Sequence, residues 1–206
     1  MIKDLGGRVA KVWETLRPLT KEMLAGEMAP ESASPKPSRP PYDAHADLEL
    51  STLLAALDEL SESHSFQNDA AKMNEMSQLT AVCVRILETR SASAEIFIQL
   101  AKRTVRNNDY ARLDGLGKRL AERYSVSEIA EVIRQCDSEP IKALAYEALM
   151  SLPVDELVPL FSDDLYSEIA TIALSRKAEE FDSEEADLTL EKFIRGDFPY
   201  NPPRDN

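Results

Sequence analysis

Residues 115–119, with the order Gly-Leu-Gly-Lys-Arg, are the part of the sequence closest to a phosphate-binding loop. In such a loop, backbone amides and a lysine surround the phosphates, and a following Ser or Thr binds Mg²⁺. The pattern requires glycine at position 112 and a hydroxyl side chain at position 119, yet Arg112 and Arg119 occupy these positions. No strand pattern precedes the loop. The sequence therefore predicts no nucleotide site here.

Residues that could ligate a metal or transfer protons are few. The chain has two histidines, His45 and His64, and neither stands in a His-Glu-x-x-His or Glu-x-x-His pattern. Gly-x-Ser-x-Gly is also missing from the sequence. We therefore expect no metal, no cofactor and no enzymatic activity. One alternative stays open, a helical enzyme or small-molecule-binding bundle whose pocket would be lined by carboxylates and by Tyr110, Tyr124 or Tyr146.

The elements that would position any such site are helices. The chain has 206 residues, 43% hydrophobic and 30% charged, which is enough to bury a core. A mean hydropathy of −0.33 is not that of an integral membrane protein. The apolar patterns have a helical period and none shows sustained strand alternation, so the predicted fold class is all-α. Helices are expected over residues 47–63, with Asp47 as N-cap, and over 68–89, 92–105, 108–123, 127–136, 139–150, 154–161, 164–180 and 184–194.

Two proline-rich stretches set the domain boundaries. Residues 27–45 contain five of the twelve prolines and few large aliphatic side chains, which predicts a disordered linker. Residues 195–206 form a second proline-rich stretch, which we expect to be a flexible tail. The predicted organisation is therefore an N-terminal segment over residues 1–26, the linker, a helical repeat domain over residues 46–194, and the tail.

A constant spacing, from position 98 to 126 to 154, relates three successive helix pairs in the predicted repeat domain; we call it the repeat stride. Seven positions of each pair are apolar or small, with one threonine as the exception, and the last is always glycine or alanine. The equivalent sets are Ile98, Ala101, Thr104, Val105, Leu113, Leu116 and Gly117; Val126, Ile129, Val132, Ile133, Ile141, Leu144 and Ala145; and Val154, Leu157, Leu160, Phe161, Ile169, Ile172 and Ala173. One helix pair cannot bury both of its faces, so the pattern predicts stacked antiparallel helix pairs, an α-solenoid.

Residues 137–149 carry a recognisable helix pattern within the middle repeat. An acidic, proline-bearing turn is followed by an aliphatic residue, a basic one at Lys142, alanines and a final leucine. This resembles the second helix of a short HEAT-like repeat, and over residues 98–180 the chain is similar to HEAT-like and armadillo-like proteins. Asp114 and Ala170 replace the basic residue in the neighbouring repeats. The resemblance implies a binding scaffold, and a helical bundle of another topology is the alternative.

The N-terminal segment has apolar residues at alternating spacings of three and four, which form one amphipathic stripe. Gly6 and Gly7 each disfavour a helix by about 1 kcal/mol and Pro18 by about 3 kcal/mol, so we expect marginal stability and a break near Arg17. A marginal amphipathic segment beyond a linker is typical of a docking peptide. The predicted apolar anchors are Val12, Trp13, Leu16 and Leu19.

What the N-terminal stripe contacts is left open by the sequence. The segment can pack against its own domain or dock on a protein partner. With a net charge of +2 it can also lie on an anionic membrane surface, which would make the chain a peripheral membrane protein.

Charge is divided unevenly along the repeats, in a chain of net charge −13. Residues 101–124 hold seven basic side chains against three acidic ones, whereas residues 137–187 hold fourteen acidic side chains against three basic ones. Charge runs of this kind are usually solvated helix faces that aid solubility. The functional alternative is another protein, or a second copy bound head to tail, as the partner, and nucleic acid is an unfavourable one. The predicted basic contact residues are Arg103, Arg106, Arg112 and Arg119.

The sequence as a whole predicts a non-enzymatic interaction scaffold or adaptor. Its mechanism would be surface complementarity, through the helical repeats and the N-terminal docking segment. Because no secretory signal or bilayer-spanning apolar run is evident, we expect the protein to be cytoplasmic.

Overall fold

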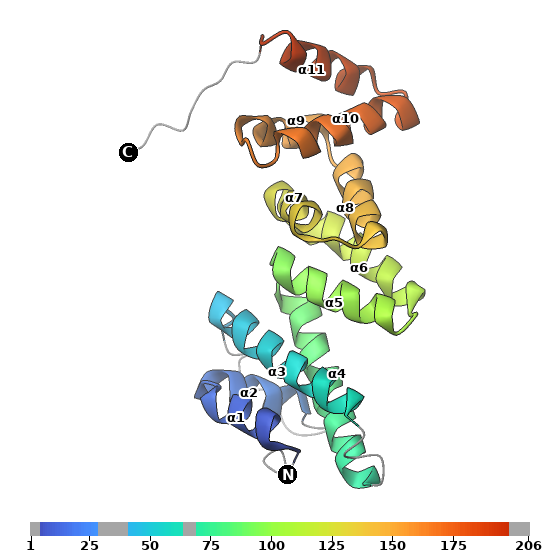
Figure 1. The fold of residues 1–206 in the computed structure, drawn as a ribbon. Helices are drawn as coiled ribbons and strands as arrows, with labels where there is room; N and C mark the ends of the chain where they lie inside the picture. The colour runs from blue at the N-terminus through green and yellow to red at the C-terminus, as the bar shows by residue number, and fades with distance from the viewer. Residues whose placement is uncertain (1–4, 29–40, 64–68, 198–206) are drawn as a thin grey trace, which may run out of the picture. The chain divides into compact units, whose positions relative to one another are not determined.

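The computed structural model describes residues 5–28, 41–63 and 69–197, and every regular element in these ranges is a helix (Figure 1). The all-α prediction is confirmed. The chain divides into two compact units, unit 1 (Met1–Ser91) and unit 2 (Ala92–Asn206). This division differs from the predicted domain over residues 46–194, because the first two helices of that range belong with the N-terminal segment.

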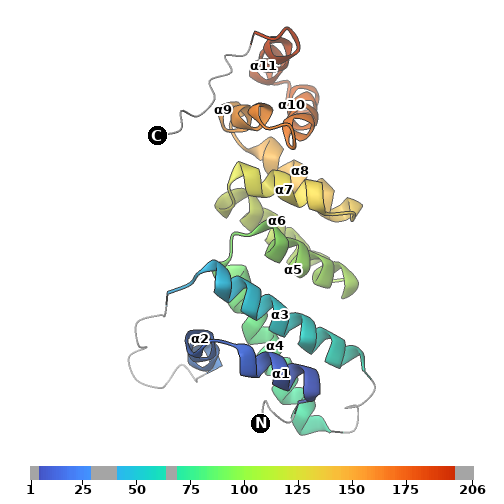
Figure 2. The ribbon, with the colours of Figure 1, turned by 60° about the vertical axis from the view of Figure 1, so that its left-hand side comes forward.

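The described part of unit 1 has four helices, α1 (Gly7–Thr15), α2 (Pro18–Met28), α3 (Ala44–Glu62) and α4 (Ala70–Arg90). α3 packs against α4, while α1 lies on α3 and α2 lies mainly on α4 (Figures 1 and 2). One face of α3 is apolar and buried, at Leu50, Leu53, Leu54 and Leu57. On α4 the first buried residue is Leu79, and the turns before it are largely exposed.

The N-terminal segment forms two helices. α1 ends at Thr15 and α2 begins at Pro18, so the break falls near Arg17 as expected. Proline has no amide hydrogen and clashes with a preceding helical turn, but it is tolerated at the first position of a new helix. α2 then reaches Met28, into the predicted linker. Residues 29–40 of that linker and residues 198–206 of the predicted tail lie outside the described residues.

Unit 2 begins with the helix pairs α5 (Ala94–Arg106) with α6 (Tyr110–Arg123), and α7 (Val126–Gln135) with α8 (Glu139–Ser151). The third pair joins α9 (Val154–Leu157) and the 3₁₀ helix η3 (Val158–Ser162) to α10 (Ser167–Phe181), and α11 (Glu184–Ile194) follows. The first helix of the third pair tightens into a 3₁₀ helix around Pro159, which cannot donate the hydrogen bond that an α-helix needs there. The other boundaries agree with the sequence-based ones to within a few residues.

Burial in unit 2 follows the repeat stride. None of the 21 equivalent positions is exposed, and Ile129, Ile141, Leu157 and Ala173 are fully buried. Contacts run within each pair and between neighbours, α5 with α7, α6 with α8, and α8 with α10. At Gly117 an added Cβ would stand 3.0 Å from Cδ2 of Leu144, so glycine permits the close approach of α6 and α8.

Three polar contacts join successive helix pairs of unit 2. The Glu128 carboxylate on α7 accepts a 2.6 Å hydrogen bond from the amide of Ala94, at the start of α5. The Tyr166 hydroxyl before α10 donates to Glu131 of α7 over 2.9 Å. The Lys177 ammonium on α10 donates to the carbonyls of Met150 and Leu152, at 2.6 and 2.9 Å. In each contact, a side chain of one helix pair forms a hydrogen bond with a polar group of the neighbouring pair.

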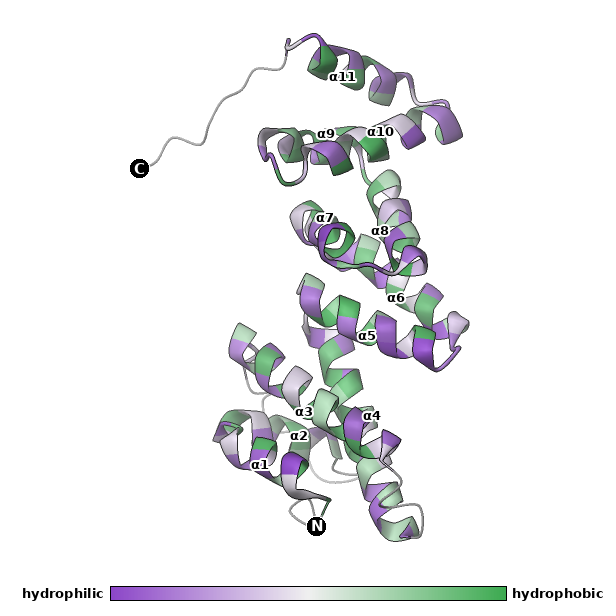
Figure 3. Ribbon diagram, in the orientation of Figure 1, coloured by the Kyte–Doolittle hydropathy of each residue, from purple (hydrophilic) through white to green (hydrophobic). Residues whose placement is uncertain are grey.

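α11 closes the described part of unit 2. Ala186 and Leu190 are buried against its neighbours, and the Phe193 ring stacks on Phe161 of η3 with centroids 4.1 Å apart. α11 begins with acidic residues, and Figure 3 shows hydrophilic residues on much of this helix.

Candidate interaction surfaces

The predicted N-terminal anchors lie on unit 1 itself. Leu16 is buried at 3% exposure, whereas Val12, Trp13 and Leu19 are half-buried. Other apolar residues of the segment are also buried, at Leu5, Val9, Met23 and Leu24. In this structure the apolar stripe therefore packs against α3 and α4, which is the first of the three alternatives left open by the sequence.

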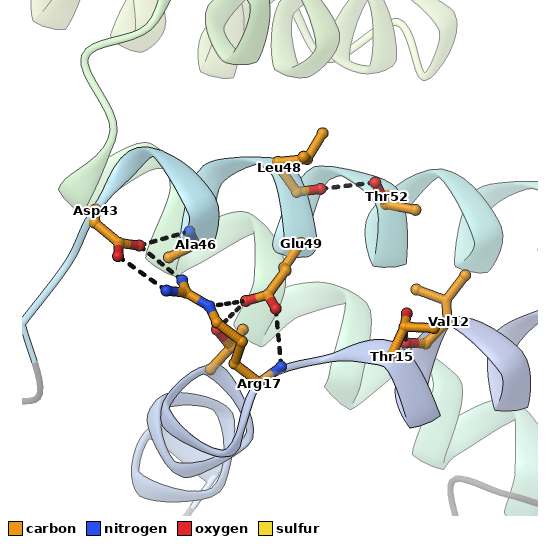
Figure 4. A network of polar contacts seen from close by, with 9 residues as sticks. Val12, Thr15, Arg17, Asp43, Ala46, Leu48, Glu49 and Thr52 are labelled. Carbon is orange, nitrogen blue, oxygen red and sulfur yellow. Dashed lines mark hydrogen bonds and ion pairs between the residues drawn. The ribbon is translucent and has the colours of Figure 1, made fainter.

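Arg17, between α1 and α2, is the centre of a polar cluster that fastens the segment to α3 (Figure 4). Its two terminal nitrogens donate to both Asp43 oxygens at 3.0 and 2.7 Å. Its backbone amide and Nε donate to the two oxygens of Glu49, at 2.8 and 3.1 Å. The buried Thr20 hydroxyl also donates to Glu49. We call Arg17, Thr20, Asp43 and Glu49 the N-terminal clamp.

The clamp stabilises its carboxylates in the charged form. Hydrogen bonds from Arg17 and from the amide of Ala46 hold the pKa of Asp43 well below its ordinary value. Burial alone would raise the pKa of Glu49, but hydrogen bonds from Thr20 and from the amide and side chain of Arg17 outweigh it and lower that pKa. Hydrogen bonds to Asp43 and Glu49 raise the pKa of Arg17. Protonating either carboxylate would therefore weaken the clamp.

The sequence did not identify the clamp as a site. Asp47 was the predicted N-cap of the first repeat helix, but α3 begins earlier and Asp43 caps it by accepting from the amide of Ala46 at 2.8 Å. The wrong choice followed from assigning residues 27–45 to a linker. An aspartate immediately before Ala44 was the available signal, since Asp is a favoured N-cap residue.

The predicted basic residues lie on α5 and α6. Arg103 and Arg106 lie in the last turn of α5, and Arg106 is exposed. Arg112 and Arg119 lie on α6, half-buried, and Arg123 extends their row. These three positions follow one another at intervals of seven and four, so they line a single face of the helix. The structure thus places one arginine row along α6, with a second basic group at the end of α5.

The charge reverses along the repeat stride at the positions of this row. Arg119 is equivalent to Glu147 on α8, while Arg112 and Arg123 are equivalent to Glu168 and Glu179 on α10. All three glutamates are exposed. The remaining equivalents are uncharged, namely Pro140 and Ser151 on α8 and Ser175 on α10, so each of the three positions carries one arginine and one glutamate across α6, α8 and α10.

A shallow groove lies between α6 and α8. It has a volume of about 320 Å³, and its floor is apolar where Gly117, Ala121, Leu144 and Ala148 meet. The remaining lining residues are Asp114, Lys118, Glu147 and Ser151. The groove exists because small residues at these positions leave space between two closely packed helices.

The three tyrosines that sequence reasoning considered for a pocket have different surroundings. Tyr110 is 59% exposed at the start of α6. The Tyr124 ring packs edge to face on Phe97, and the Arg176 guanidinium lies 4.8 Å from the centroid of the Tyr146 ring. None of them lines the groove between α6 and α8.

Comparisons with protein-family models, curated proteins and solved structures returned no match for this chain. Over the part of the chain that the structure describes, no helix is both long and apolar enough to cross a bilayer. Nor do His, Cys, Asp and Glu side chains gather in threes at a candidate metal site within these ranges.

Proposed function

We propose that this chain is a protein-protein interaction scaffold, and that unit 2 is a short HEAT-like α-solenoid whose second helices form the binding surface. The observation that carries the proposal is the reversal of charge at equivalent positions of α6, α8 and α10. Buried positions that recur with the same stride support the repeat architecture. A surface built by repetition presents its side chains at regular intervals, which suits recognition of an extended or helical partner.

Charge complementarity indicates the kind of partner for each part of this surface. The arginine row on α6 suits acidic side chains, and Arg103 and Arg106 on α5 enlarge the basic area. The acidic positions on α8 and α10 suit basic side chains. Complementary charges guide encounter and discriminate against wrong partners, and the floor of the groove between α6 and α8 adds apolar contact.

A capture experiment with matched charge reversals tests the proposal. The full-length chain is compared with Arg112→Glu/Arg119→Glu and with the control Lys192→Glu/Arg195→Glu, which changes the net charge equally but lies on α11. Quantitative mass spectrometry measures the proteins retained from a native lysate, other than the chain itself. We expect at least one partner to be retained by wild type and control and reduced about tenfold or more by the α6 variant.

Thermal unfolding of each variant shows whether it is folded. If folded α6 and control variants retain the same proteins as wild type, α6 is not the binding surface and the proposal fails. It also fails if the folded wild-type chain retains no partner.

A further inference from the structure

The contact between α8 and α10 indicates what the groove between α6 and α8 can bind. Lys118 and Ala148 line this groove. One repeat stride later, the equivalent residues are Tyr146 on α8 and Arg176 on α10. The Arg176 guanidinium lies over the Tyr146 ring, 4.8 Å from its centroid. Between α8 and α10, therefore, an aromatic ring and a cation meet at the positions that line the groove in the preceding repeat.

In the groove itself the cation is present and the ring is not. Lys118 supplies an exposed ammonium, and none of the described residues that line the groove is aromatic. We propose that a partner protein supplies the ring, as a tyrosine or tryptophan side chain that binds in the groove. The inference deepens the proposed function, on which it rests, by naming the anchor residue of the partner.

The floor and the size of the groove suit a single ring. The floor is apolar and is formed by Gly117, Ala121, Leu144 and Ala148. The volume of about 320 Å³ lies near the lower end of the range for binding pockets, which leaves room for one large side chain. Tyrosine and tryptophan are frequent anchors of protein interfaces because they bury a large apolar area.

The charged groups at the rim complement both the face and the polar tip of such a ring. The negative face of an aromatic ring attracts a cation, which Lys118 provides on a flexible stem. The carboxylates of Asp114 on α6 and Glu147 on α8 can accept a hydrogen bond from a tyrosine hydroxyl or a tryptophan N–H. An aliphatic side chain would cover these charged groups without forming either contact, so the groove should prefer an aromatic one.

NMR titration of the full-length chain tests this preference. The probe is N-acetyl-tryptophanamide, and N-acetyl-leucinamide is the matched aliphatic probe, since both are uncharged. We expect the tryptophan probe to shift the backbone amide signals of Gly117, Lys118 and Ala148. Its dissociation constant should be at least about fivefold lower than that of the leucine probe.

Two variants locate the bound ring. Lys118→Ala removes the cation and should raise the dissociation constant of the tryptophan probe about two- to fivefold. The control Lys102→Ala, on the exposed surface of α5, should leave it unchanged. Lys118→Tyr/Ala148→Arg introduces the α8–α10 pair into the groove and should abolish binding. Thermal unfolding shows whether this double variant is folded, and Lys118→Ala tests the same contact if it is not.

Three results would overturn the inference: no shift of the groove signals, equal affinity for the two probes, or equal affinity of Lys118→Ala and Lys102→Ala for the tryptophan probe. If a protein is captured through α6 while the groove rejects the probe, this inference fails and the proposed function stands. If the probe binds in the groove and no protein is captured, the aromatic preference of the groove is supported and the proposed function fails.

Discussion

Units 1 and 2 join their helices by different means. In unit 1 one cluster around Arg17 fastens α1 and α2 to α3, across 26 and 32 residues of sequence to Asp43 and Glu49. In unit 2 the side chains of Glu128, Tyr166 and Lys177 form hydrogen bonds that join successive helix pairs. The clamp gathers several polar contacts around one residue, beside the ion pairs Arg8–Glu59 and Arg85–Glu27 that also hold α1 and α2, whereas the contacts of unit 2 lie one after another along the helix pairs.

Truncating a buried leucine in either unit should have the largest effect on stability. Leu24 in unit 1 and Leu120 in unit 2 are both fully buried, so replacing either with alanine should cost about 2–5 kcal/mol. Because the units are separately compact, hydrogen exchange should quicken only in the unit that carries the substitution. Leu48→Ala, at a 66% exposed position, is the control and should change little. Equal loss of protection in both units would show that they unfold as one body.

A pair of glycine substitutions tests the close approach that the repeat requires. Gly117→Val should destabilise unit 2 by about 1–3 kcal/mol, because even its Cβ would stand 3.0 Å from Leu144. At Gly115 a Cβ meets only the Arg119 guanidinium at 4.0 Å, so Gly115→Ala should stabilise the helix by up to about 1 kcal/mol. Denaturant unfolding measures both values. The same sign for both substitutions would contradict the assigned contact between α6 and α8.

The contacts between pairs should have smaller effects. Glu128→Leu removes the acceptor for the Ala94 amide and should cost about 1 kcal/mol, as the loss of a helix cap does. The matched control is Glu122→Leu on the exposed surface of α6, which should stay within about 0.5 kcal/mol. If exchange at the first amides of α5 is unchanged in Glu128→Leu, the carboxylate does not cap that helix.

Lowering the pH should weaken the clamp and so reduce the stability of unit 1. This is the smallest of the four predicted effects on stability. The pKa values of Asp43 and Glu49 are lowered in the folded chain, so their stabilisation is complete above about pH 5 and is lost as the pH falls. Arg17→Met removes the cation, so the stability of unit 1 should fall less steeply between about pH 5 and pH 2 than in the wild type.

Unit 2 supplies the internal reference for the acid experiment. Hydrogen bonds from Arg134, Gln135 and Tyr166 lower the pKa of Glu131 to about 2, and Arg17→Met leaves this group untouched. The acid response of α7 and α10, followed by hydrogen exchange, should therefore match the wild type. An unchanged slope for unit 1 in Arg17→Met would mean that the clamp carboxylates contribute nothing to its stability.

The helices of unit 2 could be predicted because their contacts repeat. Ile129 and Leu157 are buried for the same reason at the same point of successive pairs, so a periodic sequence contains the information. Gly117 stands at the position where glycine or alanine recurs, and there α6 approaches α8 closely. In unit 1 no such repetition exists, and the sequence alone could not show whether the stripe through Val9 and Leu16 would pack on its own unit.

The clamp was missed because its residues have no characteristic spacing. Arg17 lies at the break between α1 and α2, Asp43 caps α3, and Glu49 lies on the face of α3 that α2 approaches. Only the folded chain brings these three residues together. The charge reversal from Arg112 to Glu168 was, by contrast, present in the sequence. The structure adds that the three glutamates at these positions are exposed.

The bond from Glu128 to the amide of Ala94 has a consequence for how the chain matures on the ribosome. α5 lacks the acceptor for its first amide until Glu128, 34 residues later, has been synthesised. Lys177 stands in the same relation to the carbonyls of Met150 and Leu152, 27 and 25 residues earlier. Each nascent helix pair thus lacks some of its hydrogen bonds until the next pair has been synthesised. Unit 2 should therefore reach its folded structure in overlapping steps from the amino-terminal side.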